Sequence, residues 1–234
     1  MNLGENPVLK QSVQKENDLK NFLVNYTGDM LSPEDEDVTV DQKAAGINVH
    51  EIFDVVTTLI PHYLLTEFDY ISVGDIPEFE ERQINALTKD GVIYITSDQD
   101  DSADAVDDII HEIAHTLEGK YGYEIYADGR LEKEFLSKRE SLYNLLIGHG
   151  IRGDESLFLD AEYSEEFDKF LYKDIGYPTL VNLSMGLFMT PYGITSIREY
   201  WAESFEKYFL NQAGQLKKFC PIAFIKLEEI TQND

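Results

Sequence analysis

The stretch DQDDSADAVDDIIHEIAHTLEGKYG, residues 98–122, decides the fold expected for this chain. Its apolar residues recur at helical spacing, at Ala105, Ile109, Ile110, Ile113 and Leu117. This spacing predicts a helix with one buried face, for which Ser102 is the predicted N-cap and Gly119 the predicted stop. The stretch directly before it, GVIYITSD (91–98), is rich in β-branched residues and predicts a strand.

The predicted helix carries the segment HEIAH, residues 111–115. Residues i and i+4 lie on one helix face, so His111 and His115 can offer two imidazoles to one zinc ion. Glu112 lies beside them, within reach of a water on the metal. The alternative is a pair of ordinary histidines on an amphipathic helix, but the position directly after a strand favours a metal site.

A catalytic zinc ion needs three protein ligands and an open fourth position. No third histidine follows at the metzincin spacing, because Glu118 and Tyr121 occupy the positions that would be Gly and His. The third ligand is therefore expected to be a carboxylate further along the chain.

Two carboxylates compete for this role. Glu134 lies at a suitable distance from the motif, but the residue four positions later is Lys138. The stretch SIREYWAESFEKYFLNQ (196–212) predicts a helix with Ser196 as its N-cap. Within it Glu199 is followed four residues later by Glu203, so two carboxylates share one helix face. One of them can bind the metal while the other accepts a hydrogen bond from a ligating histidine, which favours Glu199.

The segment TPYGITSIREYWAESFEKYFLNQ (190–212) resembles the third-ligand segment of the anthrax lethal factor catalytic domain and of the Pro-Pro endopeptidases. The matching positions are Tyr192, Glu199, Tyr200, Trp201, Ala202, Glu203, Ser204 and Phe205. FLNQAGQLKKFCP (209–221) and SEEFDKFLYKDIG (164–176) are also similar to segments of these families. The likeness covers residues 90–234 patchily.

The resemblance implies one zinc ion on three ligands: His111, His115 and Glu199. It implies Glu112 as general base and acid, Tyr192 as hydrogen-bond donor to the oxyanion, and Glu203 as the carboxylate behind a ligating histidine. Tyr192 as a packing residue is the alternative. The aromatic residues that flank Glu199 are assigned to the core: Tyr200, Trp201 and Phe205.

The chain departs from these families in two places. Residues 117–160 look like an added, mostly helical segment that can reshape or cover the cleft. The loop pattern that selects proline in the Pro-Pro endopeptidases is not recognisable before the strand at 91–98, so a proline preference is not transferred.

The chain is strongly acidic, with 45 acidic against 19 basic residues and a formal charge of -26 over 234 residues. This argues against nucleic-acid binding and against adsorption to anionic membranes. The acidity reflects either solubility or a preference for basic peptide substrates or partners, and a bias spread along the whole chain does not separate the two.

The sequence contains neither a signal-peptide core at its start nor a run of roughly 20 apolar residues. Localisation and oligomeric state are therefore left open, although the families it resembles are mostly exported. The single cysteine, Cys220, excludes a disulfide within the chain.

Taken together, the sequence predicts an α+β fold. A zincin-like domain at residues 67–234 would combine a small mixed sheet, with strands at 69–76 and 91–98, the motif helix and a helical C-terminal half. Residues 1–66 would form an N-terminal helical lobe, with helices at 8–26 and 40–65 and a break near Pro61.

The predicted function is a zinc-dependent endopeptidase with one catalytic ion. Its peptide or protein substrate would lie along the exposed edge of strand 91–98 as an added strand. The alternatives are a non-catalytic zinc-binding effector and a zinc hydrolase that acts on a non-peptide amide.

Overall fold

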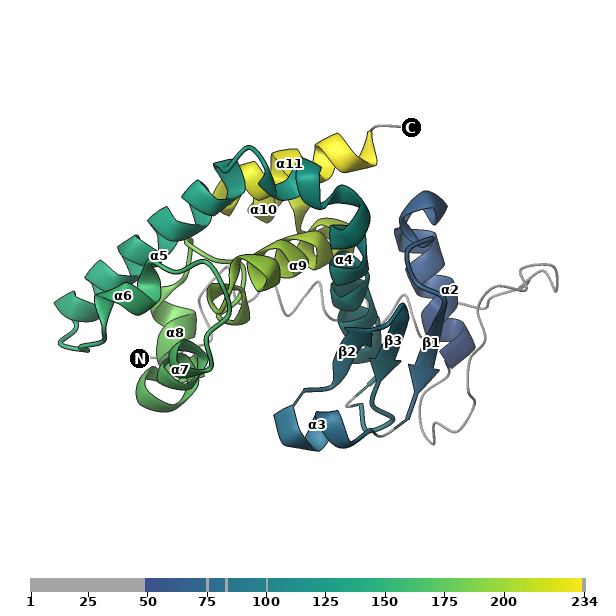
Figure 1. The fold of residues 1–234 in the computed structure, drawn as a ribbon, viewed down its shortest axis with the longest axis horizontal. Coiled ribbons are helices and arrows are strands. Elements are labelled where there is room, and N and C mark those ends of the chain that lie inside the picture. The colour runs from purple at the N-terminus through teal and green to yellow at the C-terminus, as the bar shows by residue number, and fades with distance from the viewer. Residues whose placement is uncertain (1–48, 75, 83, 100, 233–234) are drawn as a thin grey trace, which may run out of the picture. The chain divides into compact units, whose positions relative to one another are not determined.

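The computed structural model describes residues 49–74, 76–82, 84–99 and 101–232 (Figure 1). They form two compact units, one ending at Ile113 and one beginning at Ala114, and the boundary falls inside one continuous helix, α4 (Ser102–Tyr126). The predicted helix at 8–26 lies outside the described residues, and the division of the chain into 1–66 and 67–234 stays a prediction.

The first unit is built from short elements around a small sheet. In chain order they are α2 (Val49–Leu59), the 3-10 turn η2 (His62–Leu64), β1 (Tyr70–Val73), α3 (Pro77–Arg82), β2 (Ala86–Lys89), β3 (Val92–Ile95) and the first part of α4. Helix α2 lies within the helix predicted at 40–65 and ends before Pro61, where a break is predicted. The strands predicted at 69–76 and 91–98 are confirmed as β1 and β3.

Strand β3 lies in the middle of the three-stranded sheet, with β1 parallel to it on one side and β2 antiparallel on the other. Asp90 and Gly91 join β2 to β3 in a two-residue turn. Both have a positive φ, 52° and 79°, as a type I′ hairpin requires. The exposed edge predicted for strand 91–98 is therefore wrong, because β1 and β2 occupy both edges of β3.

Helix α4 begins at Ser102, and its cap lies one residue before the predicted cap. The Asp101 Oδ1 atom accepts hydrogen bonds from the main-chain N–H of Ala103 (2.8 Å) and of Asp104 (3.2 Å). Asp101 therefore caps the helix, and the prediction of Ser102 as N-cap is wrong.

Helix α4 also runs past its predicted stop, because it continues through Gly119 and Gly122 to Tyr126. Each glycine in a helix interior costs about 1 kcal/mol relative to alanine. Tertiary packing offsets this cost, since Leu117 and Ile125, on either side of the glycines, are fully buried.

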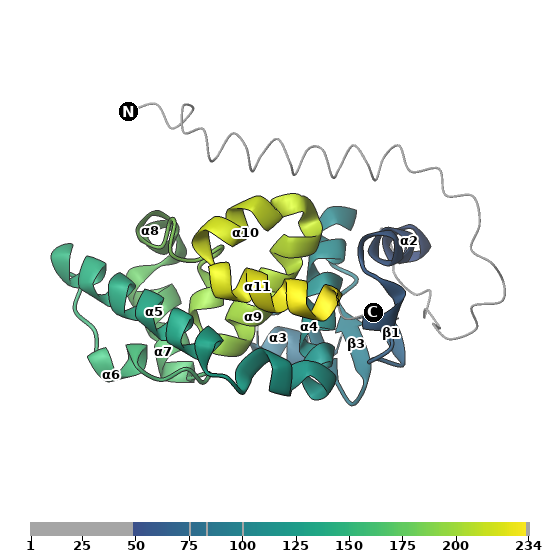
Figure 2. The ribbon, with the colours of Figure 1, turned by 90° about the horizontal axis from the view of Figure 1, so that it is seen from above.

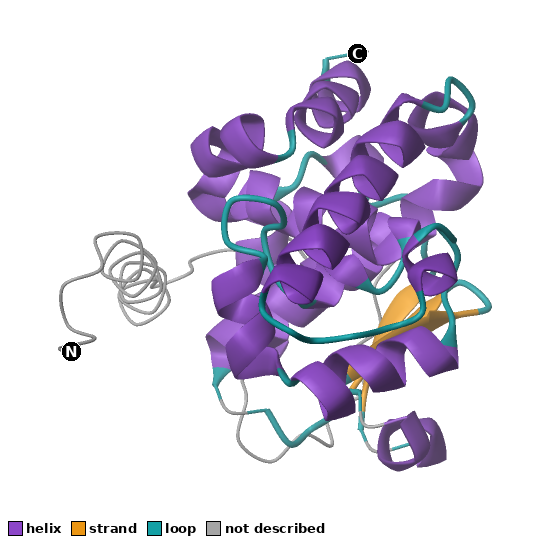
Figure 3. Ribbon diagram, turned by 90° about the vertical axis from the view of Figure 1, so that its left-hand side faces the viewer, coloured by secondary structure: helices purple, strands orange, loops and turns teal. Residues whose placement is uncertain are grey.

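The second unit is helical, and the structure assigns no strand to residues 114–232 (Figure 3). After α4 it contains α5 (Arg130–Gly148), α6 (Glu155–Phe158), α7 (Glu165–Lys169), the π turn η3 (Phe170–Ile175), α8 (Tyr177–Leu183), the 3-10 turn η4 (Tyr192–Ile194), α9 (Ile197–Lys207), the π turn η5 (Tyr208–Gln212), α10 (Ala213–Phe219) and α11 (Pro221–Thr231). The predicted helix at 196–212 is confirmed as α9, and η5 continues it to Gln212 with a kink at Leu210 and Asn211, whose dihedral angles are not helical.

Helix α9 lies at the centre of the second unit and packs against α5, α10 and α11 (Figure 2). All residues from Tyr200 to Glu206 are buried, including Trp201 and Phe205, which confirms their assignment to the core. The indole N–H of Trp201 donates to the main-chain oxygen of Ala114 on α4 (3.3 Å). This contact ties α9 to α4 within the histidine motif, at the residue before His115.

Helix α5 falls inside the segment predicted to be an addition, residues 117–160. Its buried side chains recur every three or four residues: Leu131, Phe135, Arg139, Leu142 and Leu146. The segment therefore supplies one wall of the core of the second unit.

The described residues thus form an α+β fold with a small mixed sheet and a helical C-terminal half, as predicted. Within them, no helix has both the length and the apolar character that a membrane span needs.

Candidate metal centre

Helix α4 carries the two histidines of the motif one turn apart on one face. His111 and His115 are each partly exposed, whereas Glu112 between them is buried. The main-chain oxygen of Glu112 accepts a hydrogen bond from the Thr88 hydroxyl of strand β2 (3.3 Å). Strand β2 therefore lies against the motif helix at the predicted general base.

Helix α9 presents Glu199 in its first turn. The Ser196 hydroxyl accepts a hydrogen bond from the Glu199 main-chain N–H (3.2 Å), which confirms Ser196 as the predicted N-cap. A carboxylate in this position also interacts favourably with the positive end of the helix dipole.

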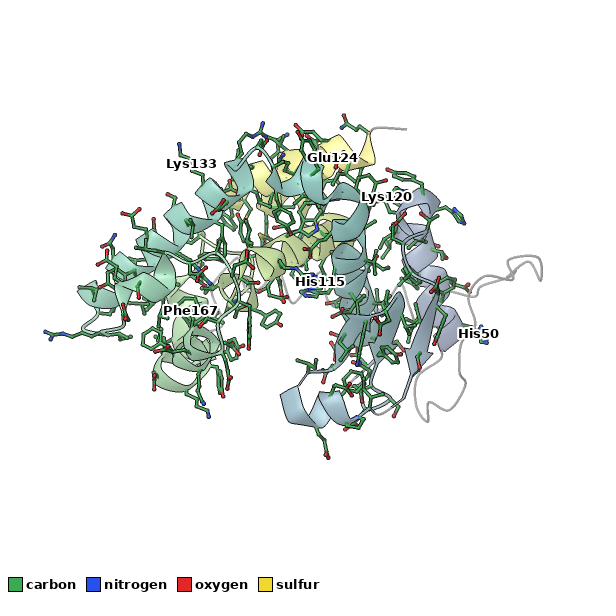
Figure 4. The ribbon with its side chains drawn as sticks, viewed as in Figure 1. His50, His115, Lys120, Glu124, Lys133 and Phe167 are labelled. Carbon is green, nitrogen blue, oxygen red and sulfur yellow. The ribbon has the colours of Figure 1, made fainter. Side chains whose placement is uncertain are left out.

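The ligand atoms of His111, His115 and Glu199 all lie within 4.8 Å of one another. The His115 Nε2 atom lies 3.5 Å from the Glu199 Oε2 atom. Figure 4 labels His115 on α4. Two ligands that each lie roughly 2.1 Å from a tetrahedral zinc ion are about 3.4 Å apart. The predicted ligands therefore have the identity and the spacing that fit one divalent transition-metal ion.

Glu118 holds the other side of the His115 ring. Its Oε1 atom lies 2.8 Å from His115 Nδ1, and its Oε2 atom accepts a hydrogen bond from the Arg198 Nε–H at 2.7 Å. Burial by itself opposes ionisation of Glu118, yet the hydrogen bonds from His115 and Arg198 hold the pKa of its carboxyl below the usual value. An ionised Glu118 fixes the His115 ring with Nε2 directed at Glu199.

The roles of Glu118 and Arg198 were missed by reasoning from the sequence. The available signal was the position of Glu118 three residues after His115, which puts both side chains on one helix face. Arg198 carries no comparable signal, because its contact with Glu118 spans 80 residues of sequence.

Glu203 is buried on α9, one turn after Glu199. Its ligand atom lies within 4.8 Å of those of His111 and Glu206. The predicted partner of a ligating histidine is therefore close to His111, whereas the partner of His115 is Glu118. Glu206, which pairs with Lys207, is a second buried carboxylate here that the sequence did not indicate.

Tyr192 lies at the start of η4, partly buried, seven residues before Glu199. Its main-chain oxygen accepts hydrogen bonds from the N–H (3.0 Å) and the hydroxyl (2.8 Å) of Thr195. The next residue, Gly193, packs against the side chain of Glu203: a Cβ atom added to Gly193 would lie 3.5 Å from Glu203 Cγ. Tyr192 thus belongs to a turn fixed beside α9, and its role towards substrate stays a prediction.

Glu134, the competing candidate for third ligand, has a different task. Its carboxylate accepts hydrogen bonds from the Tyr200 hydroxyl (2.8 Å) and from the main-chain N–H of Ile222 (2.9 Å) and Ala223 (3.3 Å). The two N–H groups belong to the first turn of α11, so Glu134 caps that helix. Because Tyr200 lies on α9, the same carboxylate also anchors α9 to α11.

Comparison of the chain with protein-family models, with curated proteins and with solved structures finds no match. The identity of the candidate metal centre therefore rests on its residues and their geometry.

Proposed function

We propose that the chain is a zinc-dependent endopeptidase. The observation that carries this proposal is the convergence of His111, His115 and Glu199 within 4.8 Å, with Glu112 between the two histidines. Two imidazoles and one carboxylate form the ligand set of many peptide-hydrolysing zinc sites and leave a fourth position open.

A zinc ion held by His111, His115 and Glu199 would supply a water molecule of lowered pKa and a Lewis acid for the carbonyl under attack. The residues of the chain supply the proton transfers. Glu112 takes a proton from the attacking water and passes it to the leaving amine. The Tyr192 hydroxyl donates a hydrogen bond to the oxygen on which negative charge develops.

The order of the residues supports a zincin-like architecture. The motif helix, Tyr192, Glu199 and Glu203 follow one another along the chain as in the anthrax lethal factor catalytic domain and the Pro-Pro endopeptidases. A preference for proline is not part of the proposal.

The outer strand β2 is the proposed place for the main chain of the substrate. It lies at one side of the sheet, and Thr88 contacts the main chain at Glu112. An extended peptide that pairs with β2 would gain main-chain hydrogen bonds as an added strand. Peptides methylated on the main-chain nitrogens near the cleaved bond should then be poor substrates.

The purified chain, incubated with a peptide library, should release new termini that a zinc chelator abolishes and added zinc restores. Glu112→Gln should keep the metal and lose about 1000-fold in kcat, because the proton acceptor is removed. Glu124→Gln is the matched control, since Glu124 is exposed on the same helix (Figure 4).

A Glu112→Gln variant that cleaves peptides at the wild-type rate would refute the assigned mechanism. A chain that binds zinc and cleaves no peptide would point to the two alternatives, a non-catalytic effector or a hydrolase of non-peptide amides.

A further inference from the structure

Arg139 of α5 is fully buried, and its guanidinium group donates to main-chain oxygens. Nε donates to Ile194 (2.8 Å) and Nη2 to Thr195 (2.7 Å). Nη1 donates to Leu157 (3.2 Å) and also to Asp160. One side chain thus joins α5 to two other segments of the second unit: α6 with the loop after it, and the turn before α9.

Two aromatic rings lie against the guanidinium group. Its Cζ atom lies 4.6 Å from the ring centre of Phe135 and 4.2 Å from that of Phe167 on α7. Burial lowers the pKa of Arg139 to about 9, and the nearby Asp160 acts in the opposite direction, so the group stays charged at neutral pH. A lysine offers neither the planar fork nor the stacking face that this position uses.

The turn that Arg139 holds connects two proposed site residues. Ile194 ends η4, which begins at Tyr192, and Thr195 donates twice to the main-chain oxygen of Tyr192. The next residue is Ser196, whose hydroxyl caps α9 and accepts the Glu199 N–H. A shift of this turn would therefore move Tyr192 and Glu199 together.

The loop after α6 fastens the same turn a second time. The Ile197 N–H donates to the main-chain oxygen of Ala161 (2.8 Å), next to Asp160, which Arg139 contacts. Arg139 thus fixes both the turn and the loop against which the turn rests.

We infer that Arg139 is a positioning residue that sets Glu199 and Tyr192 in register with the histidines of α4. Its catalytic consequence rests on the proposed function, whereas its effect on the order of residues 192–199 does not. This assigns a role in the site to the helical segment 117–160, about 60 residues away from Glu199 along the chain.

Arg139→Lys is the direct test, because it keeps the charge and loses the fork. We expect kcat to fall about 100-fold with KM unchanged, since a displacement of about 1 Å at the reacting centre has an effect of this size. Hydrogen exchange followed by mass spectrometry should show loss of protection at residues 192–199. Leu142→Ala, at another buried position of α5, is the control: it lowers the melting temperature and leaves both readouts at wild-type values.

Phe167→Leu decides the matter if Arg139→Lys does not fold, because it removes one stacking ring and keeps every hydrogen bond of Arg139. Phe167→Leu should also lower kcat and reduce the protection of residues 192–199 from hydrogen exchange, and both effects should be smaller than those of Arg139→Lys. Wild-type kcat and wild-type protection at 192–199 in either folded variant would overturn the inference. If the wild-type chain hydrolyses no peptide, the proposed function fails, and hydrogen exchange alone tests the positioning role.

Discussion

The helices α4 and α9 supply the candidate metal centre in different ways. On α4 the ligand His115 is oriented from within the same helix, by Glu118 three residues later. On α9 the ligand Glu199 depends on groups outside the helix: the Ser196 cap and the turn that Arg139 of α5 holds. One half of the site is local in sequence, and the other half is a product of tertiary packing.

This difference has a physical consequence for how the two halves respond to change. An i, i+3 contact on a helix survives as long as the helix does. A contact assembled from distant segments depends on the packing of the whole unit. We therefore expect changes around α4 to affect metal affinity and changes around α9 to affect stability as well.

The largest effect expected in this comparison is that of Glu134→Ala. It removes the cap of α11 and the hydrogen bond that the buried Tyr200 hydroxyl donates to Glu134, so the free energy of unfolding should fall by about 3 kcal/mol. Urea denaturation measures this loss. The variant should still bind one metal ion per chain, and loss of the ion would restore Glu134 as a candidate ligand.

A smaller effect is expected from Glu118→Ala. The His115 ring loses the carboxylate that fixes it, so metal affinity should fall between about 10-fold and 100-fold. Competition with a fluorescent chelator measures the affinity, with Glu124→Gln as control on the same helix. Unchanged affinity would mean that Glu118 does not orient the ring.

The smallest expected effect is a gain in stability, from Gly119→Ala. Gly119 lies in the interior of α4, and a Cβ atom added there would have no atom within 4 Å. Gly119→Ala should therefore raise the free energy of unfolding by about 0.5–1 kcal/mol without changing metal affinity. A loss of stability, measured by thermal unfolding, would show that α4 does not continue through this residue.

The sequence was sufficient for those parts of the site that follow from spacing along one helix. The i, i+4 pair His111 and His115 and the Glu199–Glu203 pair were both predicted, and the structure brings His111, His115 and Glu199 together. Glu118 was within reach of the same reasoning.

The remaining parts depend on contacts between distant segments. The role of Arg139 arises from main-chain oxygens at 157–160 and 194–195, which no local pattern marks. The prediction that strand 91–98 has an exposed edge was wrong for a similar reason, because it depends on which strands pair with β3. Strand β2 is four residues long and carries little β-branched character, although the Asp90–Gly91 pair after it is a hairpin signal.

The central claim is that one divalent ion is bound by His111, His115 and Glu199. The most direct test is the zinc content per chain of the wild-type protein and of Glu199→Ala, measured by mass spectrometry after dialysis against metal-free buffer. The wild-type chain should retain one ion and Glu199→Ala should lose it while remaining folded. A wild-type chain without bound zinc, or a Glu199→Ala chain that retains it equally well, would contradict the account.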